Sequence, residues 1–365
     1  MLVSDFDYNL PEELIAQTPM EPRDECRLMV LGRQSGEIEH RIFKDIAEYL
    51  RPGDLLVANE SRVLASRLLG RKVPTGGNAE VLLLRQHGPI TSSQTALWEA
   101  LVKPGKRLKP GAAVEFVGRD SHGRELPDGE AVLRAEVREW VEGGAPGERV
   151  VELTALKGSL DEAIHAAGKL PLPPYIHGYE GDSEMYQTVY SRQESSSAAP
   201  TAGLHFTHAL LERLSAMGVG FATVELEIGL DTFRIPTVEI AEEHRMHSER
   251  IHISQETIDR IERTKRDGGR VIAVGTTSMR TLESAWSAEE GRLVPLDGAS
   301  TSLFILPGYE FHIADGLITN FHVPKSTLMM LVSAFAGRES ILDAYEQAVA
   351  NRYRMLSFGD AMLII

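Results

Sequence analysis

The sequence contains a single cysteine, no long hydrophobic run and no basic, apolar leader. One thiol, Cys26, among 365 residues excludes an internal disulfide and favours a cytoplasmic location. No apolar run approaches the roughly 18–20 residues of a membrane-spanning helix. The opening stretch MLVSDFDYNL has no basic segment followed by an apolar one, so we expect no signal peptide. These absences predict a cytoplasmic protein without membrane association.

The common signatures of nucleotide and metal binding are also missing. The chain has neither G-x-G-x-x-G nor the lysine-containing loop that cradles phosphates, so neither a dinucleotide site nor a P-loop is indicated. The stretch HRMHSE brings together His244, His247 and Glu249. Zinc requires a further matching ligand, and H-E-x-x-H is absent. We therefore expect no metal site and interpret these histidines as surface or substrate-positioning residues.

The charge of the chain is unevenly distributed. A net charge of −15 argues against non-specific binding of nucleic acid. Residues 60–110 reverse this balance, with nine basic residues against three acidic ones. A locally positive face could hold RNA, and the alternative is an ordinary solvated surface. The candidate RNA contacts are the closely spaced bases Lys103, Lys106, Arg107 and Lys109.

Length and pattern together predict two domains. Short alternating segments separated by Gly and Pro turns occupy residues 60–155, which predicts an inserted antiparallel β-barrel. Residues 1–59 and 156–365 carry apolar strands and amphipathic helices, so we expect one α/β sandwich domain with a mixed sheet. The expected strands of the α/β domain include 27–31, 54–59, 219–228, 270–274, 303–306, 317–321 and 361–365. Its expected helices include 208–217, 255–265, 327–336 and 340–351, and the expected barrel strands are 79–85, 95–102, 113–117, 131–136 and 149–153.

The stretch 198–207, AAPTAGLHFT, has little side-chain bulk and leads into the helix expected at 208–217. Pro200, Ala202 and Gly203 would let a ligand approach the backbone closely. Thr207 stands where an N-cap belongs, and His205 ordinarily titrates near neutral pH. The alternative is an ordinary loop whose threonine caps a helix and whose histidine packs locally.

Two further polar turns link a strand end to a helix start. The first, after the strand at 270–274, contains Thr276, Thr277, Ser278 and Arg280. Such a turn directs amides and hydroxyls at a ligand beyond the strand's carboxyl end. Alternatively, Ser278 caps the helix and Arg280 forms a surface ion pair.

The other turn, at 319–327, spans the end of the strand at 317–321 and contains Asn320 and His322. The Asn320 amide can both donate and accept hydrogen bonds, and His322 can accept or donate a proton. Alternatively, both side chains only satisfy backbone groups. Three such turns in one chain favour a shared cleft, in which His205 and His322 would lie together.

Five stretches of the chain resemble the S-adenosylmethionine:tRNA ribosyltransferase-isomerase family of queuosine synthesis. They are LPEELIAQTPMEPR (10–23), AAPTAGLHFT (198–207), VGTTSMRTLE (274–283), TNFHVPKST (319–327) and GDAMLI (359–364), in family order. The resemblance implies a β-barrel inserted in an α/β domain. It also implies transfer and isomerisation of the ribosyl group of S-adenosylmethionine onto 7-aminomethyl-7-deazaguanine at the tRNA wobble position. The products would be epoxyqueuosine-tRNA, adenine and methionine, formed without a metal or redox cofactor by a protein we expect to be a monomer.

The resemblance also favours a substrate site at the polar turns. The implied chemistry requires proton transfer, for which His205 and His322 are the candidates, and substitution of either by Ala should lower turnover more than tenfold. The expected substrate-binding residues are Pro200, Thr201, Ala202, Gly203, Thr276, Thr277, Ser278, Arg280 and Asn320.

Three residues depart from the family pattern. Glu227 stands where His is frequent, while Asp231 and Ser195 stand where Gly is usual. They put in doubt any scheme that needs a histidine at 227 as the base. The alternatives are an S-adenosylmethionine-dependent RNA methyltransferase, disfavoured by the missing glycine-rich loop, and a non-catalytic RNA-binding protein.

Overall fold

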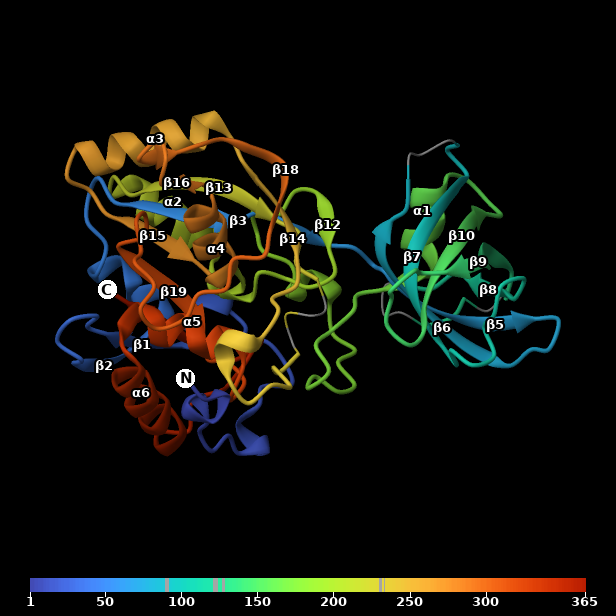
Figure 1. Ribbon diagram of the computed structural model, residues 1–365, viewed down its shortest axis with the longest axis horizontal. Coiled ribbons are helices and arrows are strands. Elements are labelled where there is room, and N and C mark those ends of the chain that lie inside the picture. Colours follow the sequence, from blue (N-terminus) through green and yellow to red (C-terminus); the bar gives the residue numbers. More distant parts are fainter. Residues whose placement is uncertain (89–91, 121–123, 127–128, 230–231, 233) are drawn as a thin grey trace. The chain divides into compact units, whose positions relative to one another are not determined.

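The chain forms two compact units. The computed structural model describes residues 1–88, 92–120, 124–126, 129–229, 232 and 234–365 (Figure 1). The first unit comprises Met1–Arg62, Pro173–Tyr179 and Glu184–Ile365, and the second comprises Val63–Leu172 and Glu180–Ser183. The second unit therefore extends beyond residue 155, where the sequence pattern placed the end of the insertion.

A mixed sheet organises the first unit. Its nine strands within the described residues run in the order β18 (Leu296–Thr301), β14 (Glu249–Ile253), β13 (Gly220–Leu226), β3 (Leu55–Asn59), β15 (Val271–Val274), β19 (Gly316–Asn320), β20 (Ala361–Ile364), β1 (Arg27–Leu31) and β2 (Ile38–Ile42). Neighbours from β13 to β19 pair in parallel, while β20 runs antiparallel to β19 and parallel to β1. The parallel strands β13, β3, β15 and β19 consequently end at one edge of the sheet.

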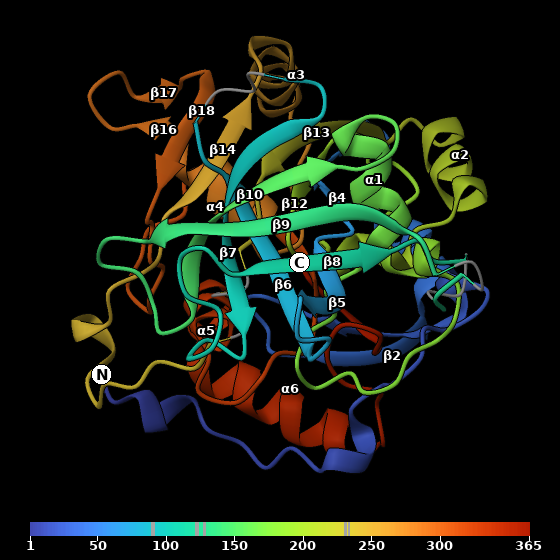
Figure 2. The same ribbon diagram turned by 90° about the vertical axis from the view of Figure 1, so that its right-hand side faces the viewer.

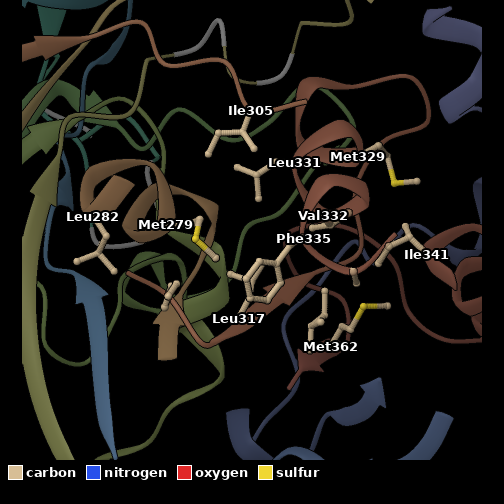
Figure 3. Close-up of a cluster of buried hydrophobic side chains, with 14 of the residues drawn as sticks. Met279, Leu282, Ile305, Leu317, Met329, Leu331, Val332, Phe335, Ile341 and Met362 are labelled. Carbon is tan, nitrogen blue, oxygen red and sulfur yellow. The ribbon is translucent and has the colours of Figure 1, made fainter. Parts of the chain in front are cut away.

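Both faces of this sheet are buried, which explains its nearly continuous apolar strands. Along β3, Leu55 and Val57 join one hydrophobic core, whereas Leu56 and Ala58 join the other. The first core includes side chains of α3 (Gln255–Arg266), α4 (Thr276–Ser284), α5 (Thr327–Ala336) and α6 (Arg338–Ala350). Part of it is drawn in Figure 3. The second core includes α2 (His208–Ala216) and the 3-10 helix η4 (Phe43–Glu48). The predicted α/β sandwich with a mixed sheet is confirmed.

The second unit is an antiparallel barrel, as predicted. Among the described residues its six strands are β5 (Arg67–Val73), β6 (Asn78–Gln86), β7 (Thr95–Lys103), β10 (Glu148–Ala155), β9 (Ala131–Trp140) and β8 (Ala113–Val117), and β8 pairs back to β5 (Figure 2). The short strand β11 (Gly168–Lys169) also pairs with β5. Helix α1 (Leu160–Ala167) buries Leu160, Ala163, Ile164 and Ala167 in the core of the barrel. Because α1 packs on these strands, it belongs to the barrel unit.

Some local expectations were wrong. The segment 303–306 is not a strand, and the nearby strand is β18 instead. Strands β5 and β14 were not predicted. β5 contains Gly70 and three basic residues, which weaken its apolar pattern. No helix among the described residues is long and apolar enough to cross a membrane.

Candidate active site

All three polar turns contribute residues to one cavity in the α/β unit. The cavity lies where β15 and β19 end, beside the segment that precedes α2. The cavity has a volume of about 60 Å³ and is open to solvent on one side. The predicted site residues that line it are Pro200, Thr201, Ala202, Thr276, Thr277, Asn320 and His322.

Gly275 makes the junction between β15 and α4. It has φ of +91°, a conformation that side-chain-bearing residues rarely adopt. Its amide donates to the Ile318 carbonyl over 2.8 Å, which ties the turn to β19. This bend brings Thr276 and Thr277 to the cavity. The Thr277 hydroxyl oxygen is buried and has no hydrogen-bond partner among the described residues, so it is available to a ligand.

A chain of hydrogen bonds fixes the Asn320 amide. The Thr201 hydroxyl donates to Asn320 Oδ1 over 2.8 Å, and Asn320 Nδ2 donates to the Leu356 carbonyl over 3.3 Å. Because the Leu356 carbonyl can only accept, the Asn320 atom that faces it must be the NH₂ nitrogen, and this sets the orientation of the Asn320 side chain. Asn320 Nδ2 is then also the donor to His205 Nε2, at 3.1 Å.

This geometry determines the tautomer of His205. Since Nε2 accepts from Asn320, the ring proton lies on Nδ1, which faces Cys26 Sγ at 3.2 Å. Burial, together with the positive charges of Arg23 and Arg354, lowers the pKa of His205 to about 3. Burial likewise raises the pKa of the Cys26 thiol. His205 does not line the cavity, and its neutral ring orients Asn320 from behind.

His322 lies in the cavity wall, with both ring nitrogens engaged. Its backbone amide donates to the Tyr345 hydroxyl over 3.1 Å, so that hydroxyl can give its own proton to Nδ1, also at 3.1 Å. Nε2 then carries the ring proton and faces the Thr319 hydroxyl at 3.1 Å. Burial lowers the pKa of His322 to about 3. To act as a base, His322 must exchange one of these partners for substrate.

Two further predicted site residues lie behind the cavity wall. Gly203 is required by packing, because a Cβ there would lie 2.0 Å from the Tyr190 hydroxyl oxygen. Ser278 does not cap α4. Its fully buried hydroxyl donates to the Val274 carbonyl over 2.8 Å, within the first turn of the helix.

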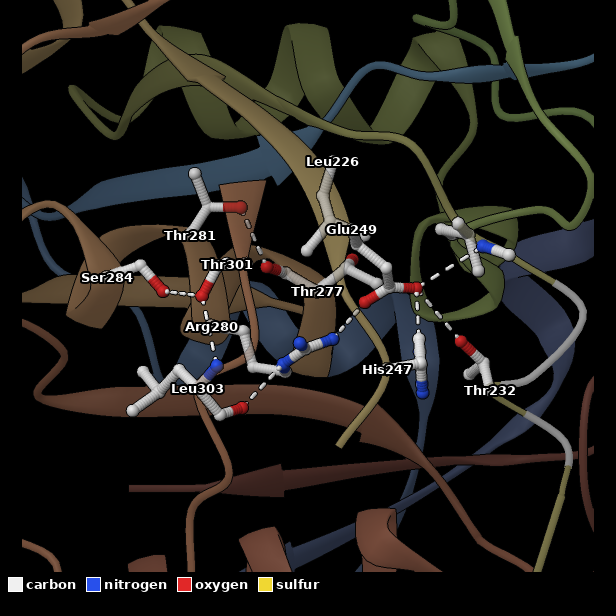
Figure 4. Close-up of polar contacts among 12 residues, drawn as sticks. Leu226, Thr232, His247, Glu249, Thr277, Arg280, Thr281, Ser284, Thr301 and Leu303 are labelled. Carbon is white, nitrogen blue, oxygen red and sulfur yellow. Dashed lines mark hydrogen bonds and ion pairs between the residues drawn. The ribbon is translucent and has the colours of Figure 1, made fainter. Parts of the chain in front are cut away.

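Arg280 forms a buried ion pair with Glu249, a partner that the sequence did not indicate (Figure 4). Glu249 also accepts from the Thr232 hydroxyl over 3.1 Å, and Thr232 lines the cavity. Burial raises the pKa of Glu249, but His247 and Arg280 outweigh it and hold the pKa below its usual range. Arg280 thus supports the cavity wall through Glu249. No group of three or more acidic, His or Cys ligands suited to a metal occurs within the described residues.

A second cavity of about 460 Å³ in the same unit contains two of the three departures from the family pattern. Ser195 donates to Glu225 over 2.6 Å, and Glu227 lies 4.0 Å from Arg250. Burial raises the pKa of Glu227. Ser195 and Glu227 therefore share one polar environment, and the third departure, Asp231, lies outside the described residues.

The predicted RNA contacts lie on the barrel unit. Lys103 ends β7, and Lys106, Arg107 and Lys109 occupy the turn that follows. All four side chains are exposed, and none forms an ion pair within the part of the chain that the structure describes. Their charges are therefore free to meet an anionic partner.

Comparison with known proteins shows which family the chain resembles. A family model described as queuosine biosynthesis protein matches residues 3–364. The S-adenosylmethionine:tRNA ribosyltransferase-isomerases of Acetivibrio thermocellus and Desulforamulus reducens are 52% and 50% identical over 365 residues, covering all of each chain. The crystal structure of S-adenosylmethionine tRNA ribosyltransferase from Thermotoga maritima is 37% identical, with a TM-score of 0.54 over 99% of this chain and 100% of that one. The chain therefore belongs to the S-adenosylmethionine:tRNA ribosyltransferase-isomerase family of queuosine biosynthesis.

Proposed function

We propose that the chain transfers and isomerises the ribosyl group of S-adenosylmethionine onto the aminomethyl group of 7-aminomethyl-7-deazaguanine at the tRNA wobble position. The products are epoxyqueuosine-tRNA, adenine and methionine. One observation carries the assignment of the site. Residues from three family stretches, at 198–207, 274–283 and 319–327, line a single cavity in a chain that belongs to this family.

The reaction sets demands that these side chains can meet. The sulfonium acidifies the adjacent ribose carbon, from which a base must remove a proton. Adenine must leave with a proton or a hydrogen bond, and the incoming amine must be neutral to attack. Among the described residues that line the cavity, His322 is the one whose side chain ordinarily titrates near neutral pH. We assign proton transfer to His322, while His205 acts through Asn320.

The hydroxyl and amide groups of the cavity would orient the substrate. The Thr201 hydroxyl donates its hydrogen bond to Asn320, so its oxygen can accept a hydrogen bond from a ligand. The Thr277 hydroxyl, which has no partner among the described residues, can both donate and accept. Ribose hydroxyls and the ends of methionine offer groups of this kind.

We also propose that the barrel holds tRNA through Lys103, Lys106, Arg107 and Lys109. Four exposed positive charges within seven residues, none of them in an ion pair with a described residue, support this role, because an acidic chain needs a locally positive face to bind RNA. This role does not require the four side chains to lie near bound S-adenosylmethionine.

Product analysis tests the function. The protein is incubated with S-adenosylmethionine and precursor tRNA, without added metal or nicotinamide, and the products are separated by chromatography. Adenine and methionine should appear in step with tRNA modification. S-adenosylhomocysteine with methylated RNA would instead establish a methyltransferase, and tRNA binding without any product would indicate a non-catalytic RNA-binding protein.

A further inference from the structure

Trp140 is the most exposed large hydrophobic side chain among the described residues, with 55% of its surface accessible. It ends strand β9 of the barrel unit. Indole has a large apolar surface that is normally buried. Burial in the barrel core does not explain Trp140, because it is absent from the buried cluster there.

One face of the indole is already covered. The guanidinium carbon of Arg149 lies 3.5 Å from the ring centroid of Trp140. Arg149 is only 3% exposed, and it pairs with Trp140 across strands β9 and β10. A cation stacked on one face holds the ring in a fixed plane. The exposed surface is therefore that of an oriented ring.

The same arginine joins Trp140 to the basic turn. Arg149 donates to the carbonyls of Gly105 and Leu108 over 2.9 Å and 3.1 Å. These carbonyls belong to the segment that carries Lys106, Arg107 and Lys109. The indole and the exposed bases consequently lie at one end of the barrel, built around a single buried side chain.

The charge of this end suits a polyanion. Arg149 and the four exposed bases contribute five positive charges. They stand against four carboxylates: Glu139, Glu142 and Glu148 on the adjoining stretch, and Glu80, which lies opposite Lys103 on β6. Glu148 accepts from the Ala145 amide over 2.8 Å and so has a role in its own turn. An oriented aromatic face beside basic residues is the combination that binds unpaired nucleotides, since bases stack on the ring while phosphates meet the cations.

We propose that Trp140 is a stacking platform for an unpaired base of the tRNA, held in position by Arg149. The inference rests on the proposed function only in taking tRNA as the partner. It adds a non-electrostatic interaction to the basic turn, and the two contributions differ in their response to salt. Removing a stacking surface lowers affinity at every salt concentration, whereas removing a cation that neutralises a phosphate changes the slope.

The test measures the dissociation constant of precursor tRNA at several salt concentrations for the full chain and four variants. Trp140→Ala and Trp140→Leu should weaken binding about 5- to 100-fold with an unchanged salt slope. Trp140→Phe, which keeps an aromatic face, should lose only a few-fold. Leu156→Ala removes another exposed apolar side chain of the barrel unit, 44% accessible, and should have no effect.

The KM for S-adenosylmethionine and the turnover at saturating tRNA should stay unchanged in all four variants. Wild-type affinity in Trp140→Leu would overturn the proposal, as would a flattened salt slope, because the indole would then act only by ordering the basic turn. Circular dichroism shows whether each variant is folded. If Trp140→Ala is unfolded, the difference in tRNA affinity between Trp140→Phe and Trp140→Leu tests the proposal. If the wild-type chain itself bound no precursor tRNA, the proposed function would fail.

Discussion

The protonation of individual side chains controls which atoms of the cavity can accept a proton. His205 and His322 are both buried and neutral, yet their surroundings differ. His205 is committed to Asn320 and Cys26 behind the cavity, whereas His322 lies in its wall. The sequence indicated both histidines as candidates for proton transfer. It could not show that an amide 115 positions away from His205 would occupy its Nε2 atom.

The neutral state of His205 has a consequence for stability. Its pKa is about 3 in the folded chain and about 6.5 when unfolded, so the unfolded state binds more protons between these values. Stability contributed by the neutral ring is complete above pH 6.5 and is lost as the pH falls toward 3. Between pH 6 and 4.5, His205→Asn should therefore reduce the slope of unfolding free energy against pH by about 1 kcal/mol per unit.

Chemical denaturation at several pH values measures this slope. Thr201→Val, which alters the same hydrogen-bond chain without removing a titratable group, serves as the control and should keep the wild-type slope. Equal slopes in His205→Asn and wild type would show that His205 takes up a proton equally in the folded and unfolded states.

At the level of elements, the junction of β15 and α4 shapes the cavity. An added Cβ at Gly275 would lie 3.6 Å from Ala202 Cβ, in ordinary contact, so the backbone conformation and not space demands glycine. Gly275→Ala should lower the unfolding free energy by about 1–3 kcal/mol. It should also raise the KM for S-adenosylmethionine, because Thr276 and Thr277 follow directly.

Gly291→Ala provides the matched control. Gly291 also has a positive φ, +62°, and an added Cβ would meet nothing within 4 Å. It does not line the cavity. This variant should lose stability without a change in KM. An unaltered KM in Gly275→Ala, measured from initial rates of adenine release, would separate this turn from S-adenosylmethionine binding.

Local patterns predicted most elements because those elements depend on local signals. The helix that begins at His208 has Thr207 as its N-cap, which accepts from the Leu210 amide, as expected. β1 and β8 have their predicted bounds. β14 was missed although Glu249, Ile251 and Ile253 alternate inward, because its histidines suggested a ligand site instead. Long-range pairs such as Arg280 with Glu249 leave no local pattern to detect.

At the level of the whole molecule, the cavity and the basic turn lie in different units. The cavity belongs to the α/β unit, while the exposed basic residues at 103–109 belong to the barrel unit. Changing Lys103, Lys106, Arg107 and Lys109 to Ala should weaken tRNA binding. It should also flatten the slope of the logarithm of the binding constant against the logarithm of salt concentration, by roughly 0.7–0.9 for each phosphate that the variant no longer neutralises. Affinity for S-adenosylmethionine should remain nearly unchanged.

Titrations of precursor tRNA at several salt concentrations measure this effect. The control is a double variant, Arg263→Ala and Arg266→Ala, which removes two exposed bases from α3. It should leave the salt slope of tRNA binding unchanged. An unaltered slope in the quadruple variant would remove the basic turn from the RNA-binding surface.

The central claim is that ribosyl transfer takes place at the cavity where β15 and β19 end. The most direct test is the single-turnover rate of adenine release from S-adenosylmethionine with precursor tRNA, comparing His322→Ala with His208→Ala. His322 lines the cavity, whereas His208 is exposed at the start of α2. We predict a rate more than tenfold lower for His322→Ala, within the range of general acid–base groups, and a near wild-type rate for His208→Ala. A cooperatively folded His322→Ala variant that releases adenine at the wild-type rate would contradict the account.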